Sequence, residues 1–170
     1  MSKKYFILIS VIVILIAGAY FYFQIPNQRI ASETKRINDS IEESKNNTKE
    51  LLDKNVNNLV ENLRQTQANA KSGKNDLAWG IHLINKDSEN SFYEIFSTAS
   101  DYAQARTKEM ISLDKNVKFC RPLQESMDVV FAKGEGTINT DTSIILCFRH
   151  GYTDPRLINI NGSGEISSLE

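Results

Sequence analysis

The chain has 170 residues, of which 24% are charged and 41% hydrophobic, and its net charge is −1. This length and composition are typical of one folded domain with extensions. Because there is no basic excess, nucleic acid is not expected as a partner.

Residues 5–23, YFILISVIVILIAGAYFYF, form an uncharged run near the N-terminus. As a helix the run would span about 28 Å, close to the bilayer core of about 30 Å. Lys3 and Lys4 precede it, and the next positive charge is Arg29. The positive-inside rule therefore predicts a single-pass membrane protein, in contact with membrane lipid, with residues 1–4 in the cytoplasm and the rest extracytoplasmic.

A cleaved signal peptide is the alternative interpretation of the same residues. It would have a basic start, an apolar core over 5–16, and a small-residue cleavage pattern at Ala17-Gly18-Ala19. The apolar run continues through Phe23, which is longer than a signal peptide needs and favours a retained transmembrane helix. Both interpretations place residues 27–170 outside the cytoplasm.

Residues 27–71 contain neither Gly nor Pro, and their apolar residues recur at spacings of three and four. This spacing predicts one face of a long helical stalk. The first half of the stripe is thin, so it should project from the domain or lie against a partner, and a sustained coiled coil is the less favoured alternative. The second half is denser and should pack on the globular part. The stripe consists of Ile30, Thr34, Ile37, Ile41, Thr48 and Leu51, followed by Leu52, Val56, Leu59, Leu63 and Ala70.

Pro26 lies between these two helical segments. It lacks an N–H donor, so it would either start the second helix or kink one continuous helix that ends near Ser72-Gly73.

Residues 76–170 change to short apolar runs between turn residues, which predicts an antiparallel β head domain. The last two runs alternate around the turn NGSG and predict a hairpin. A helix followed by strands indicates an α+β fold with the helix packed on one face of an antiparallel sheet. The expected strands are 79–84, 91–97, 117–120, 129–131, 143–148, 156–160 and 165–169.

The two cysteines, Cys120 and Cys147, both lie in the exported part. An even number of cysteines in an oxidising compartment favours one disulfide, and two buried thiols are the alternative. In the chain-entropy account, the bridge would stabilise the domain by about 3–4 kcal/mol.

No motif for catalysis, cofactor binding or metal binding is found, so neither an enzyme nor a small-molecule substrate is predicted. His82 and His150 are far apart and, with two isolated cysteines, lack metal-ligand spacing. Asp141 and Asp154 flank turns, where they would be weak Ca²⁺ ligands or, as we favour, solvated turn residues. The sequons at Asn46 and Asn161 match glycosylation acceptors.

The passage NLVENLRQTQANAKSGKNDLAWGIHL resembles the helix-to-first-strand passage of type IV pilin-like proteins, most closely the minor pseudopilins of GspH/FimT type. The order of later motifs, MDVVFAKGEG and the closing RLININGSGEI, is similar as well, and the match covers about residues 56–168. The resemblance implies a bacterial pilin fold. It also implies a structural subunit of a type IV pilus or type II secretion-type assembly, whose partners are other pilin-like subunits bound through the N-terminal helix.

The N-terminal signal departs from the family pattern. If Tyr5 were the mature start, Lys4 would replace the usual glycine and Ile9 the usual glutamate. The alternative function is therefore a single-pass, membrane-anchored extracytoplasmic binding module that reuses a pilin-like head.

The single tryptophan gives a further expectation about the core. Trp79 would begin the first strand and cover the seam between helix and sheet, together with Leu59 and Leu63, while its indole N–H finds a nearby acceptor.

Overall fold

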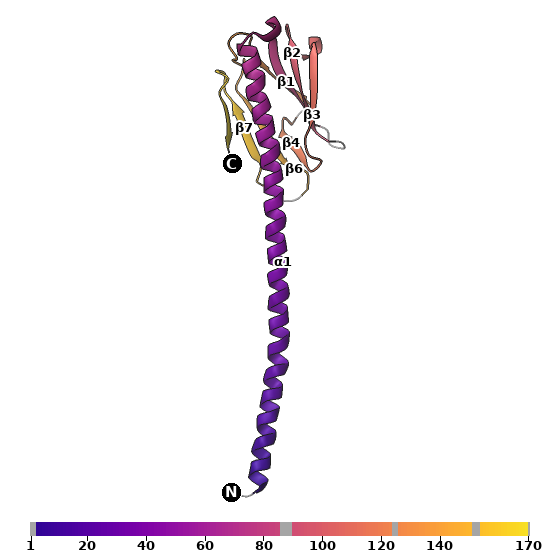
Figure 1. The fold of residues 1–170 in the computed structure, drawn as a ribbon, viewed down its shortest axis with the longest axis vertical. Coiled ribbons are helices and arrows are strands. Elements are labelled where there is room, and N and C mark those ends of the chain that lie inside the picture. Colours follow the sequence, from indigo (N-terminus) through magenta and orange to yellow (C-terminus); the bar gives the residue numbers. More distant parts are fainter. Residues whose placement is uncertain (1–2, 86–89, 124–125, 151–153, 170) are drawn as a thin grey trace. The chain divides into compact units, whose positions relative to one another are not determined.

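A computed structural model describes residues 3–85, 90–123, 126–150 and 154–169, except for the side chains of residues 3–13, 17, 19–28, 107 and 108. Its described elements are one long helix, two short 3-10 helices and eight strands (Figure 1). The chain divides into two compact units, residues 1–46 and residues 47–170. We call the second unit the head unit.

The helix α1 comprises Lys3–Lys71. It ends where the sequence predicts, because Gly73 adopts a left-handed φ of 61°, a conformation that a residue without Cβ adopts at little cost. The N–H groups of Ser72 and Gly73 donate to the carbonyls of Ala68 and Ala70, which satisfies the last turn.

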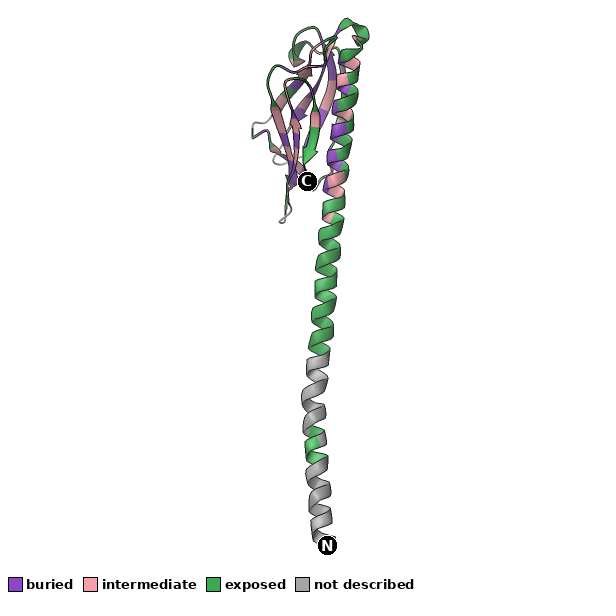
Figure 2. Ribbon diagram, turned by 90° about the vertical axis from the view of Figure 1, so that its left-hand side faces the viewer, coloured by how far each residue is buried: buried purple, intermediate pink, exposed green. Residues whose placement is uncertain are grey.

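In the unit of residues 1–46, every described side chain of α1 is exposed (Figure 2). The exposed residues include the three isoleucines of the thin stripe, Ile30, Ile37 and Ile41, at 61%, 60% and 49%. Among the described residues, no helical stretch combines the length and the apolar character needed to cross a membrane. Most side chains of the predicted transmembrane segment, residues 5–23, lie outside the part of the chain that the structure describes.

The helix does not restart at Pro26, since α1 continues through this position. The side chain of Pro26 lies outside the described part, so the predicted kink stays a prediction.

The head unit contains two antiparallel four-stranded sheets, in the orders β3-β2-β1-β5 and β4-β6-β7-β8. The C-terminal part of α1 lies along them (Figure 1). The short 3-10 helices are η1, Lys74–Asp76, and η2, Tyr102–Gln104. The strands are β1 Ala78–Ile84, β2 Phe92–Thr98, β3 Thr107–Ser112, β4 Val117–Arg121, β5 Ser126–Phe131, β6 Thr142–Phe148, β7 Arg156–Ile160 and β8 Ile166–Leu169.

One hydrophobic core joins α1 to both sheets. The helix contributes the dense half of the predicted stripe, and the strands contribute alternate residues, as expected for sheets with one face buried. The fully buried members with the largest side chains include Leu59, Leu63, Ile81, Tyr93, Phe119, Phe131, Leu146 and Ile158.

The predicted α+β architecture and the β7–β8 hairpin are confirmed, with Ile160 paired to Ile166 next to the NGSG turn. Two expectations differ from the structure. The strands form two sheets instead of one. The sequence analysis also missed β3, because the segment TKEMIS has two charged residues and only two adjacent apolar ones; it is ordered by pairing with β2 at the sheet edge.

Candidate functional site

The structure places the three predicted core residues in one cluster at the seam between helix and sheet. Leu59 and Leu63 are 0% exposed, and Trp79 is 6% exposed at the start of β1. The Trp79 indole N–H donates to the Lys74 carbonyl at 3.0 Å, and the Lys74 ammonium lies 5.1 Å from the centre of the ring. Trp79 therefore fixes the turn between α1 and β1, and both its contacts are structural.

Polar side chains of α1 hold three loops of the head unit against the helix. Gln67 donates from its amide to the carbonyls of Gly136 at 2.8 Å and Gly164 at 2.6 Å. Both glycines have positive φ, and a Cβ on Gly164 would lie 2.1 Å from the Gly136 carbonyl. Asn55 similarly accepts from the Asp114 N–H at 3.0 Å. These bonds satisfy backbone groups that the loops would otherwise leave unpaired.

Tyr93 lies on the buried face of β2 and is 1% exposed. Burial raises the pKa of its hydroxyl above the usual range. The hydrogen bond from the Asn62 amide, at 2.7 Å, lowers this pKa, and the negative charge of Glu109 raises it. Tyr93 is thus a neutral core residue with one hydrogen-bond partner on α1.

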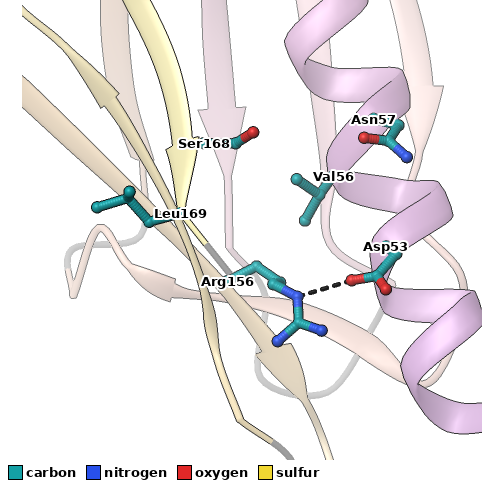
Figure 3. Close-up of a pocket in the computed structure, with 6 residues that line it drawn as sticks. All are labelled: Asp53, Val56, Asn57, Arg156, Ser168 and Leu169. Carbon is teal, nitrogen blue, oxygen red and sulfur yellow. Dashed lines mark hydrogen bonds and ion pairs between the residues drawn. The ribbon is translucent and has the colours of Figure 1, made fainter. Parts of the chain in front are cut away.

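A small cavity of about 160 Å³ lies between α1 and strands β7 and β8 (Figure 3). At one end, Arg156 Nε donates to Asp53 Oδ1 at 2.6 Å, and the Arg156 side chain is only 8% exposed. The rest of the lining is Val56, Asn57, Ser168 and Leu169. The charges at this end compensate one another, so the cavity offers no free charge to a ligand.

A second polar cluster lies on the sheet β3-β2-β1-β5, on the face opposite to the one that joins the hydrophobic core. His82 on β1 is in register with Glu94 on β2 and Asp128 on β5. Its Nδ1 lies 2.5 Å from Asp128 Oδ1, and the ring of Tyr102 stacks on it at 3.7 Å between centroids. The Tyr102 hydroxyl donates to Glu94.

This cluster covers an aromatic contact on the same face. Phe96 is 0% exposed and meets the Tyr102 ring edge-on, with its own ring lying against Gly80. Among the described contacts, His82 faces a carboxylate and an aromatic ring, with no Ser or Cys nucleophile beside it. The arrangement holds the segment containing η2 on the sheet and has no part resembling a catalytic triad.

The remaining candidates from sequence do not converge on one site. Within the described ranges, no three His, Cys, Asp or Glu side chains are placed to hold a metal ion. Asp141 accepts from the Gly162 N–H at 2.6 Å and so supports the β7–β8 turn, and Asp154 gives its carbonyl to Arg156. His150 is exposed in the loop after β6.

The predicted disulfide is present and joins two neighbouring strands. Cys120 on β4 bonds to Cys147 on β6, with 5.8 Å between their Cα atoms. The pairing of β4 with β6 shifts between Phe119 and Arg121, so Cys120 lies at a bulge. The bridge therefore secures an edge strand at the position where its hydrogen-bonded ladder is interrupted.

Sequence reasoning missed the Gln67, Gly80 and Asp53–Arg156 contacts. Gly80 follows Trp79 in the sequence, and its role is explained only by the Phe96 ring that lies over it. Gln67 and Arg156 are polar residues in a helix and a strand, and nothing local distinguishes them from solvent-exposed neighbours.

The comparisons with known proteins agree with this architecture. No model of a known protein family matches the chain, and no curated protein matches it by sequence. The crystal structure of the type IV minor pilin FimU of Pseudomonas aeruginosa matches with a TM-score of 0.52 and 18% identity, over 70% of this chain and 88% of that chain. The fold is pilin-like. At this identity the likeness concerns the fold alone, and the finer assignment to the GspH/FimT type rests on the sequence resemblance.

Proposed function

We propose that this protein is a pilin-like structural subunit of a type IV pilus or type II secretion-type assembly. Residues 5–23 would hold it in the membrane with the N-terminus in the cytoplasm and the head unit extracytoplasmic. Other pilin-like subunits would bind along its N-terminal helix.

The observation that carries this proposal is the contrast between the two parts of α1. In the head unit the helix buries its apolar stripe against the sheets, with Leu52, Leu59 and Leu63 at most 1% exposed. In residues 1–46 the described apolar residues have no such cover, including Ile14, Leu15 and Ile16 at 64–69% exposure. A pilin-like fold with an uncovered apolar helix is suited to packing against lipid and against neighbouring helices.

The charges of the exposed helix also suit packing against related helices. Between residues 29 and 46 both signs alternate along the surface, beginning with the Arg29–Glu33 pair at 3.5 Å. Such a surface lets neighbouring helices pair opposite charges at its rim, while the isoleucines make the apolar contact.

Photo-crosslinking tests the assembly proposal directly. A benzophenone amino acid at Ile37, which is 60% exposed, should capture other pilin-like subunits in native membranes and give a ladder of adducts. The matched control is the same group at Asp39, two residues on and therefore about 200° around the helix. Equal and ladder-free adducts at both positions would count against assembly through this helix.

The second candidate is the membrane-anchored binding module, which is favoured by Lys4 and Ile9 at the positions of the family's glycine and glutamate. The intact mass of the protein from native membranes, without reduction, separates the candidates. A chain that begins at Tyr5 supports processing and assembly, whereas a chain that begins at Met1 supports a permanently anchored module. A chain that begins at Tyr20 contradicts both membrane proposals.

A further inference from the structure

Strand β8, Ile166–Leu169, forms one edge of the second sheet, and no described strand pairs with its outer side (Figure 1). The N–H of Asn161 donates to the Glu165 carbonyl, so the pairs with β7 that exchange hydrogen bonds are 161/165, 159/167 and 157/169. Along β8, the backbone N–H and C=O groups of Ile166 and Ser168 therefore point to the free edge.

The side chains of β8 are unlike those of the other sheet edges in the described structure. Unpaired edges are usually blunted by charges, bulges or prolines, which prevent pairing with another chain. The other edge strands have such features, whereas the four residues of β8 are uncharged and regularly paired with β7. The features are Glu109 on β3, Asp128 on β5, and Lys118, Arg121 and a bulge on β4.

The inner face of β8 has a large side chain next to a small one. Ile166 packs against the core, and two residues later Ser168 lies opposite the fully buried Ile158 and lines the cavity beside α1 (Figure 3). Ser168 is small and exposed, so the cavity is open at this position. On the outer face Ser167 is exposed, and Leu169 is 55% exposed at the end of the strand.

We propose that β8 is a self-association surface, at which the β8 strands of two copies of this chain pair antiparallel and join their second sheets. Pairing centred on Ser167 brings Ile166 opposite the partner's Ser168, and Ser168 opposite the partner's Ile166. The unpaired backbone groups then bond one another, and each large side chain faces the mouth of the partner's cavity. Identical strands place like residues near the twofold axis, so an uncharged strand can pair with itself without repulsion.

This pairing closes after two copies, because the same edge is used on both. It forms a dimer of head units and no filament, so it is a separate property from the assembly proposed above. Failure of the dimer would leave that assembly untouched.

A cysteine at the twofold axis tests the register. Ser167 would face the partner's Ser167 in a non-hydrogen-bonded pair, with Cα atoms about 4.5 Å apart, a separation that a disulfide accepts. The native cysteines are bonded to each other, so Ser167→Cys adds a single free thiol. In the full-length chain in detergent, mild oxidation should give at least about fivefold more covalent dimer for Ser167→Cys than for Ser163→Cys, an exposed control on the adjacent turn.

Two further variants test the pairing itself. Ser168→Pro removes a backbone N–H that β7 does not use, so the double variant Ser167→Cys/Ser168→Pro should keep the fold but lose the excess dimer. Ser167→Lys, on the exposed face, places two like charges opposite each other and should shift the wild-type dimer to monomer in light scattering. The proposal is overturned if Ser167→Cys gives no more dimer than Ser163→Cys, or if folded Ser168→Pro protein still gives it.

Discussion

The division of α1 into a part packed on the sheets and an exposed part predicts very different effects for two similar substitutions. Leu59→Ala and Ile37→Ala each shorten an aliphatic side chain of the same helix to alanine. Leu59 is 0% exposed in the core of the head unit, whereas Ile37 is 60% exposed in residues 1–46. The environment of the two side chains, and not their chemistry, should decide the result.

The magnitude for Leu59→Ala follows from burial. About three carbon atoms are removed, which at about 0.8 kcal/mol for each buried CH₂ costs about 2.4 kcal/mol. The cavity left among rigid strands raises the loss in the free energy of unfolding to about 3–4 kcal/mol. For a head unit of about 120 residues, a loss of 3 kcal/mol lowers Tm by about 12 °C. Ile37→Ala should change the free energy of unfolding by less than about 0.5 kcal/mol.

Urea unfolding of the full-length chain, followed by tryptophan fluorescence, measures both effects. The chain has a single tryptophan, Trp79, which is 6% exposed in the core and so reports on the head unit alone. If Leu59→Ala unfolds at the same urea concentration as wild type, the helix does not pack on the sheets as described. If Ile37→Ala destabilises the head unit by a similar amount, the assignment of an exposed half is refuted.

Three further predictions concern the head unit. Gly80→Ala should lower the free energy of unfolding by about 2 kcal/mol, because its Cβ would lie 2.6 Å from Phe96 Cζ; no change in the urea midpoint would mean that the ring does not lie over β1. Replacing Cys120 and Cys147 by alanine should cost about 3–4 kcal/mol in the same assay, and a loss below about 1 kcal/mol would contradict a constraining bridge. In absorbance titration, Tyr93→Phe should remove a tyrosine that ionises above the usual range, because burial raises the Tyr93 pKa. The stability that neutral Tyr93 contributes should be complete below pH 10 and should decline as the pH rises further. Urea midpoints of wild type and Tyr93→Phe, compared at neutral and alkaline pH, would check this.

Some elements are determined by a few neighbouring residues, and the sequence predicted these elements correctly. The spacing of apolar residues determined the helical face, and the denser apolar stripe around Leu59 and Leu63 predicted which part of the helix packs on the head. Gly73 determined the helix end through its free access to positive φ. The NGSG turn determined the β7–β8 hairpin. In each case a few adjacent residues are enough to restrict the backbone.

The arrangement of the strands was decided by contacts between residues far apart in the chain. Division into two sheets depends on β1 pairing with β5, about 50 residues later, and no periodicity within a strand reports its neighbour. For the same reason β3, whose composition is polar, becomes a strand only because β2 offers it a free edge.

The sequence by itself determined that this protein has a long helix followed by a β-rich head with one cysteine pair. Only the tertiary structure decided which polar and small residues matter. Gln67 is distinctive because two loop carbonyls converge on its amide, Gly80 because a ring covers it, and Ser168 because it lines an open cavity at a free edge. A side chain's role depends on what surrounds it, and those surroundings exist only after distant segments have packed together.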